Sequence, residues 1–276
     1  MWKSLISILF VLVLGGCATE VEKIETHTAT ITISGENEYK AVRLTPKIYN
    51  NIDGDISDLL IKDSEGEVIP YFIHTGKETD FIESIEPVFS VESEYKNTTI
   101  MIEDLKNLRL LDVTIHTDSM FKRNVHIADV NKELYNLTLS EELDADTTID
   151  LGGYASSKEV LKLVIDDGDD KPIKIDGVTV RYYADDVIFA GSLEKKSYTL
   201  EFGSDENKTA PKYDIVRYQD EILKGSVDKV TIADIQVVAA EEEVVTPRDY
   251  QIVFNIVISA VALLLGVVIV LKIRKR

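Results

Sequence analysis

Hydrophobic and polar residues alternate along most of the chain from residue 26 onward, which is the period-two pattern of half-buried β-strands. Residues 28–34 alternate in this way, the polar segment 35–37 interrupts the pattern, and residues 39–44 alternate again. Two alternating runs separated by a short polar segment indicate an antiparallel pair of strands joined by a turn. The sequence therefore predicts a β-hairpin at residues 28–44.

The same pattern continues to residue 238. Residues 58–62 and 67–73 predict a second hairpin, because Gly66 provides the positive φ that a tight turn needs. Further strands are predicted at residues 87–91, 98–102, 109–115, 123–127, 147–151, 160–165, 173–183, 187–189, 197–202, 213–217 and 229–238, and short helical turns at 132–142 and 218–223. Because no longer helical segment separates the strands, the pattern favours an all-β fold of sandwich type over alternating strands and helices.

The length of this strand-rich region predicts two domains. About 230 residues are enough for two domains of ordinary size, each with its own core. We place two β-sandwich domains at residues 24–105 and 106–240, because polarity rises and the strand pattern pauses at residues 103–107. Residues 241–250, with three consecutive glutamates and Pro247, predict a short linker.

Residues 1–17 have the three-part layout of an export signal, with Lys3 near the start, an apolar run and small residues after it. The sequence Leu-Gly-Gly-Cys at residues 14–17 resembles the lipobox of bacterial lipoproteins, in which cleavage leaves a lipidated cysteine as the first residue. We therefore predict lipidation of Cys17, and the alternative is ordinary signal cleavage after Ala18. Cys17 is the only cysteine, so the remaining chain must fold without a disulfide.

The other end of the chain predicts a membrane anchor. Residues 252–271 form an apolar run of 20 residues in which Asn255 and Ser259 are the only polar side chains. A helix of this length spans about 30 Å, the thickness of the hydrocarbon core of a bilayer. The basic residues that follow directly mark the cytoplasmic side. We predict a single transmembrane helix at residues 251–272, a cytoplasmic tail at 273–276, and an extracytoplasmic ectodomain before them.

Charge narrows the range of partners. The chain carries 30 basic and 49 acidic residues, and five of the basic residues lie in the export signal, the span or the tail. The ectodomain therefore has 25 basic and 49 acidic residues, a net charge of −24. Such a surface repels nucleic acids and anionic lipid headgroups, which excludes a nucleic-acid role. We interpret the many acidic residues as a source of solubility and of separation from the membrane rather than as an acidic ligand site.

Two stretches of the ectodomain carry a family resemblance. Residues 39–73 contain an alternating strand, Pro46, Tyr49, and the sequence Gly-Glu-Val-Ile-Pro-Tyr at residues 66–71. Together with residues 158–218, they resemble an uncharacterised family of bacterial membrane proteins, one of the domain-of-unknown-function families. The later stretch is also similar, more loosely, to galactose-binding-like jelly rolls. The resemblance covers about a third of the chain and implies an export signal, a β-sandwich ectodomain and one C-terminal helix, but no chemistry.

The motifs of common enzymes do not occur in the sequence: the four histidines form no zinc-binding pattern, and no glycine-rich phosphate loop is present. The best candidate for a ligand site is Asp166, Asp167, Asp169 and Asp170, which surround Gly168. Four carboxylates around a glycine turn provide the hard oxygen ligands that Ca²⁺ prefers. The alternative is an exposed turn that uses Asp and Gly for their backbone freedom. No other cofactor is predicted.

A carbohydrate site requires exposed aromatic rings on which sugars stack. The single tryptophan lies in the export signal, which leaves Tyr154, Tyr182 and Tyr183 as candidates. We therefore predict a non-enzymatic membrane-anchored surface protein of the bacterial cell envelope whose β-sandwich ectodomain binds another envelope protein, since sandwich edges and loops are common recognition surfaces. The alternative function is a carbohydrate-binding surface module.

Overall fold

The computed structural model describes most of the predicted ectodomain. The described residues are 26–52, 56, 58–137, 144–195, 197–203 and 212–238, with three short stretches at 257–261, 264–265 and 271–274. Those from Thr26 to Val238 belong to one compact unit, and those from Val257 onward belong to a second. The predicted export signal with Cys17 and the predicted linker lie outside the described residues.

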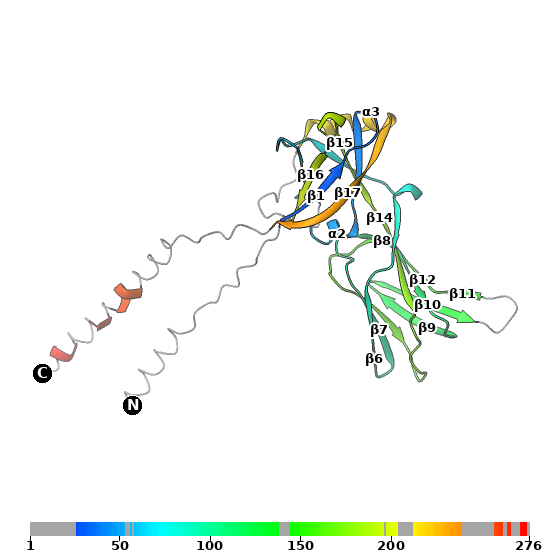
Figure 1. The fold of residues 1–276 in the computed structure, drawn as a ribbon. Coiled ribbons are helices and arrows are strands. Elements are labelled where there is room, and N and C mark those ends of the chain that lie inside the picture. Colours follow the sequence, from blue (N-terminus) through cyan, green and yellow to red (C-terminus); the bar gives the residue numbers. More distant parts are fainter. Residues whose placement is uncertain are drawn as a thin grey trace. The chain divides into compact units, whose positions relative to one another are not determined.

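Strands dominate the described chain, and the all-β prediction is confirmed. One sheet has seven strands in the order β3-β16-β1-β17-β2-β15-β4. Figure 1 labels its strands β1, β15, β16 and β17. Neighbouring strands in this sheet are antiparallel, except that β17 pairs with β2 in parallel. Its strands are β1 (Thr26–Thr32), β2 (Tyr39–Arg43), β3 (Leu60–Asp63), β4 (Tyr71–Thr75), β15 (Asp185–Ala190), β16 (Ser197–Phe202) and β17 (Val227–Val238).

Two further sheets contain the strands between β4 and β15. A six-stranded sheet has the order β11-β10-β9-β13-β7-β6, and a four-stranded sheet has the order β12-β8-β14-β5. Their strands are β5 (Ile82–Ile85), β6 (Phe89–Glu94), β7 (Asn97–Ile102), β8 (Arg109–His116), β9 (Phe121–Ile127), β10 (Val130–Leu137), β11 (Asp144–Asp146), β12 (Thr148–Ala155), β13 (Leu161–Asp166) and β14 (Gly177–Tyr183).

These two sheets are β-sandwich-like, and we call them together the sandwich; their hydrophobic core is continuous with that of the seven-stranded sheet, which contributes side chains such as Ile31 and Val187. The six-stranded sheet contributes fully buried side chains such as Ile100 and Leu163, and the four-stranded sheet contributes Leu110, Val113 and Val180. Each such side chain contributes roughly 1.5–3 kcal/mol when it is fully buried. Alternation explains the choice of residues, since every second position of a strand faces the core.

The sheets do not follow the predicted division into residues 24–105 and 106–240. β1 to β4 pair with β15 to β17, and the sandwich consists of the strands between them, so its chain segment is inserted into the seven-stranded sheet. The pause at residues 103–107 is the connection from β7 to β8, where Asp104 and Asn107 have positive φ angles of 59° and 62°. Local polarity marked a turn there, whereas long-range strand pairing sets the organisation of the fold.

The helical elements are short: α2 (Pro46–Tyr49), α3 (Gln219–Lys224), η1 (Thr79–Phe81), η2 (Leu193–Lys195) and η4 (Asp214–Tyr218). The helical turn predicted at residues 218–223 is confirmed by α3, but the strand predicted at 213–217 is wrong, because η4 occupies that position. The helical turn predicted at 132–142 is also wrong for its described part, which belongs to β10. Pairing with β9 and burial of Leu134 outweigh the local helical preference there.

The C-terminal stretches belong to the predicted span and tail. Val257–Val261, residues 264–265 and residues 271–274 are helical, and the remaining residues of the predicted span 251–272 lie outside the described chain. Within the described residues, no helix has both the length and the apolar character needed to cross a membrane.

Candidate functional site

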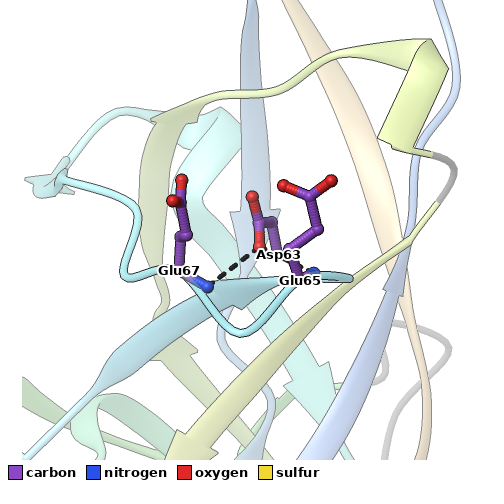
Figure 2. A group of neighbouring side chains, drawn as sticks. All are labelled: Asp63, Glu65 and Glu67. Atoms are coloured by element: carbon purple, nitrogen blue, oxygen red, sulfur yellow. Dashed lines mark hydrogen bonds between the residues drawn. The ribbon is translucent and has the colours of Figure 1, made fainter.

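Three carboxylates meet at the turn after β3, which we call the first acidic turn: Asp63, Glu65 and Glu67. Their closest oxygens lie within 4.8 Å of one another, and Figure 2 shows the three side chains on the same side of the turn. Gly66 has the predicted positive φ, 84°, and its N–H donates to the carbonyl of Asp63 at 3.0 Å. The hairpin predicted around it is wrong as a pair of strands: the turn forms an isolated antiparallel bridge, while β3 pairs with β16 and β4 pairs with β15. Oxygen Oδ1 of Asp63 accepts from the backbone N–H groups of Glu65 at 2.9 Å and Glu67 at 3.0 Å.

Lys195 neutralises this turn. Its ammonium group forms an ion pair with Oδ2 of the buried Asp63 and contacts Oε2 of Glu65 at 3.2 Å. The hydrogen bond from Lys195, followed by those from the backbone of Glu67 and Glu65, holds the pKa of the Asp63 carboxyl below its usual value. The carboxylates of Asp63 and Glu65 in turn raise the pKa of Lys195. Lys195 therefore stays charged at physiological pH and supplies the positive charge between these carboxylates.

The first acidic turn offers hard oxygen ligands of the kind that Ca²⁺ and Mg²⁺ prefer. Asp63 is buried, while Glu65 and Glu67 are exposed to solvent. A divalent cation would have to displace the ammonium of Lys195 from Asp63, which costs the existing ion pair. The arrangement therefore acts first as an internal ion pair that fixes the turn. The sequence pattern did not predict this ion-paired turn, because Lys195 lies 132 positions away from Asp63.

The predicted calcium ligands lie in the turn after β13, residues 166–170, which we call the second acidic turn. Asp167 is buried, and it pairs with Arg123 and accepts from Oγ1 of Thr98 at 2.6 Å. Asp166 accepts from the backbone N–H of Gly168 at 3.0 Å, and Asp169 pairs with Lys96 at 2.9 Å. Asp170 is exposed. Among the described residues, a trio of carboxylates that meets within 4.8 Å occurs in the first acidic turn and not here.

The side chains of the second acidic turn face different neighbours. The backbone N–H of Asp167 donates to the carbonyl of Lys96 at 2.8 Å, which ties the turn to the β6–β7 hairpin. Arg123 reaches the same turn from β9 and donates to the carbonyl of Lys171 at 2.8 Å. The alternative interpretation from the sequence is an exposed turn that uses Asp and Gly for their backbone freedom; Gly168 has a positive φ of 59°, but Asp167 is buried. The calcium site itself stays a prediction.

The tyrosines proposed as sugar platforms are largely covered. Tyr182 is buried with 3% of its surface exposed, and burial raises the pKa of its hydroxyl. Tyr154 and Tyr183 are half-buried, and the guanidinium of Arg109 lies 5.6 Å from the centre of the Tyr183 ring. A sugar stacks on an accessible aromatic face, so this group does not form an open platform.

A buried polar cluster joins α2, β8 and β15. Asp185 has 3% of its side chain exposed, accepts from the hydroxyl of Tyr49 at 2.7 Å and pairs with Nη2 of Arg109 at 2.8 Å. Burial, together with the charge of Asp185, raises the pKa of Tyr49. These residues connect the seven-stranded sheet to the sandwich where the chain passes from β14 to β15. Nothing in the local sequence signals this cluster, because Tyr49 and Asp185 lie 136 positions apart.

A second ion-paired group lines a surface hollow of about 210 Å³ that also includes His74, Phe81 and Leu223. Arg43 contacts Asp186 at 2.8 Å through Nε, and it contacts Glu83 at 2.8 Å through Nη1. The hydrogen bonds that Arg43 donates to Asp186 and, to a smaller extent, to Glu83 raise its pKa. The guanidinium is therefore already saturated by this chain's own acids, which makes it a poor receptor for an external anion.

Three apolar side chains in and directly before the β6–β7 hairpin are exposed. Val88, Val91 and Tyr95 have 63%, 41% and 88% of their surface exposed. Lys96, at the tip of the hairpin, has a positive φ of 67° and lies 5.5 Å from the centre of the Tyr95 ring. Strand patterning predicted both strands but gave no indication that this hairpin would leave apolar groups in solvent. Alternation along the strand puts Val88 and Val91 on opposite faces, so these side chains are exposed at the edge of the sheet rather than in one patch.

No known protein family, curated protein or solved structure matches this chain. The family resemblance suggested by residues 39–73 and 158–218 therefore stays a prediction.

Proposed function

We propose that this protein is a non-enzymatic, membrane-anchored component of the bacterial cell envelope whose sandwich binds another envelope protein. The observation that carries the proposal is the exposure of Val88, Val91 and Tyr95 in and directly before one hairpin. A protein partner gains free energy by covering such groups, at roughly 25 cal/mol per Å² of apolar surface removed from water. The export signal and the span predicted from the sequence place the sandwich outside the cytoplasmic membrane, where an envelope partner would meet it.

Carbohydrate binding has less support. The exposed ring of Tyr95 has the ammonium of Lys96 over it, Tyr182 is buried, and the half-buried ring of Tyr183 lies beside the guanidinium of Arg109. We also propose that the sandwich has the fold of a galactose-binding-like jelly roll. In that fold, too, recognition would occur at an edge or at a loop, because the inner faces of the two sheets are buried in the core.

Site-specific crosslinking in the native host tests the proposal. A photoreactive amino acid replaces Tyr95 in the full-length chain, and a second variant carries it at Tyr218, which is 61% exposed but lies in η4. We expect irradiation to give discrete protein adducts from position 95 and fewer from position 218, identified by mass spectrometry. Equal adducts from both positions, or glycan adducts alone from position 95, would contradict the proposal.

A further inference from the structure

β6 is the last strand of the six-stranded sheet and has a free edge. In the part of the chain that the structure describes, its only strand partner is β7, with the register Phe89 opposite Ile102 through Glu94 opposite Asn97. A free edge leaves a row of backbone N–H and C=O groups available for another strand. Natural sheets cover such edges or place charged side chains on them, and β6 is charged but is not covered by another strand of the described chain.

The hydrogen-bond pattern identifies the free backbone groups. The N–H of Glu103 donates to the carbonyl of Val88 at 3.0 Å, so the polar groups of Val88 face β7. In an antiparallel ladder this direction alternates from residue to residue. The N–H and C=O groups of Phe89, Val91 and Ser93 therefore point away from β7, toward the open side of the sheet.

One face of β6 is apolar and incompletely covered. Residues directly opposite each other in an antiparallel pair share a face, so Phe89 and Val91 lie on the same face as Ile102 and Ile100 of β7. Both isoleucines are completely buried, whereas Phe89 is half-buried and Val91 is 41% exposed. The apolar face of the six-stranded sheet thus continues onto β6, where it is only partly buried, and an added strand would extend this apolar face.

The other face of β6 is acidic. Ser90, Glu92 and Glu94 occupy every second position of β6 and lie together on this exposed face. Neither glutamate forms an ion pair with the described residues. The net charge of the chain is −19, so two copies repel each other and self-pairing through β6 is disfavoured. A strand with basic residues on the matching face gains attraction instead.

We infer that β6 binds an extended segment of a partner protein in which apolar residues alternate with Lys or Arg. The segment adds to the sheet as a strand: its backbone pairs with Phe89, Val91 and Ser93, its apolar side chains cover Val91, and its basic side chains face Glu92 and Glu94. This inference rests on the proposed function and specifies the partner chemistry and the mode of recognition.

Designed peptides test this mode directly. The probe is an acetylated eight-residue peptide of alternating valine and lysine, mixed with the full-length chain in a neutral detergent, and the control peptide alternates valine and glutamate. We expect the lysine peptide to bind at least about tenfold more tightly at low salt, because the charges on β6 distinguish the two peptides. Hydrogen exchange should slow at the amides of Phe89, Val91 and Ser93. Peptide mixed with detergent alone controls for binding to micelles.

A matched pair of variants separates strand addition from adhesion to charge. Val91→Pro removes a donor that points to the open side and leaves the bonds to β7 intact, whereas Val91→Thr keeps that donor. We expect about tenfold weaker binding of the lysine peptide for Val91→Pro and little change for Val91→Thr. Circular dichroism confirms that both variants fold. Glu92→Gln with Glu94→Gln should weaken binding about threefold to tenfold, with less dependence on salt.

Three results would overturn the inference: unchanged binding by Val91→Pro, slowed exchange elsewhere than β6, or a dimer in sedimentation whose β6 amides are already protected without peptide. Protein adducts from position 95 together with any of these results would leave the proposed function standing while strand addition fails. Absence of protein adducts, together with peptide binding on β6, would point to a fortuitous edge and count against both.

Discussion

The two acidic turns have the same components but differ in where their carboxylates point. Each contains a glycine with positive φ, each has an aspartate that accepts a backbone N–H, and each buries one aspartate against a basic residue. In the first acidic turn, Lys195 pairs with Asp63; in the second, Arg123 pairs with Asp167. Three carboxylates converge only in the first among the described residues.

Hydrogen bonding within each turn explains the difference. Oδ1 of Asp63 accepts from the backbone N–H groups of both Glu65 and Glu67, so the first acidic turn closes around the Asp63 carboxylate and brings its three acids together. In the second acidic turn, Arg123 and Thr98 hold Asp167 in the interior, while the other three aspartates stay exposed. A high density of acids therefore does not by itself predict a cation site.

The largest expected effect is on the buried pair of the second acidic turn. Asp167→Asn leaves the guanidinium of Arg123, with 9% of its side chain exposed, without its carboxylate partner. Removal of one member of a buried pair costs about 3–5 kcal/mol of unfolding free energy. Chemical denaturation of the full-length chain, followed by circular dichroism, measures this loss.

Asp169→Asn is the matched control for this experiment. The Asp169 side chain is 96% exposed, so loss of its pair with Lys96 should change the unfolding free energy by less than about 0.5 kcal/mol. Equal losses in the two variants would mean that the pair of Asp167 with Arg123 stabilises the fold no more than the exposed pair of Asp169 with Lys96.

Much of the strand content could be predicted from the sequence, because a strand that is buried on one face has apolar residues at every second position. The runs at residues 28–34, 98–102 and 197–202 correspond closely to β1, β7 and β16. β5 was not predicted, since its residues Ile82–Ile85 are mostly half-buried and carry little contrast. The insertion of the sandwich was not predicted either, because β1 and β16 pair although they lie far apart in the sequence, and such pairing produces no local sequence pattern.

The site residues were harder to predict. The sequence reasoning identified Asp167 as a ligand candidate, but its partners Thr98 and Arg123 come from strands far away in the chain. Lys195 likewise reaches Asp63 across 132 positions. Whether an acid is paired internally or free for a cation depends on such distant residues, so composition and spacing alone do not settle it.

A smaller effect is expected from pH at the first acidic turn. The pKa of Asp63 is lowered in the folded chain by its hydrogen bond to Lys195, so this group stabilises the fold above its unfolded pKa of about 3.8. That contribution is lost as the pH falls from there through the lower folded pKa. Asp63→Asn keeps an oxygen that accepts from the backbone of Glu65 and Glu67 but loses the ion pair.

We therefore expect Asp63→Asn to lower Tm by a few degrees at pH 7, and the difference from the wild type to shrink steadily as the pH falls below 3.8. Thermal unfolding at a series of pH values gives the two curves. A constant difference across the whole range would show that the ion pair with Lys195 adds nothing, and that only the backbone turn matters.

The smallest effect is expected from calcium, and it tests both turns together. In the wild type Lys195 already supplies positive charge at Asp63, and Arg123 and Lys96 do so in the second acidic turn. Millimolar Ca²⁺ and Mg²⁺ should therefore raise Tm equally and slightly, as screening of a chain with a net charge of −19 requires.

Lys195→Met should change that result, because it leaves Asp63, Glu65 and Glu67 within 4.8 Å of one another without the ammonium. This variant should be less stable than the wild type without divalent cations and should recover more of its Tm with Ca²⁺ than with Mg²⁺, since Ca²⁺ accepts irregular oxygen geometry. The double variant Asp167→Asn with Asp169→Asn tests the other turn. If it removed a rise in Tm specific to Ca²⁺ that the wild type shows, the second acidic turn would be the calcium site, and internal pairing would not have prevented binding there.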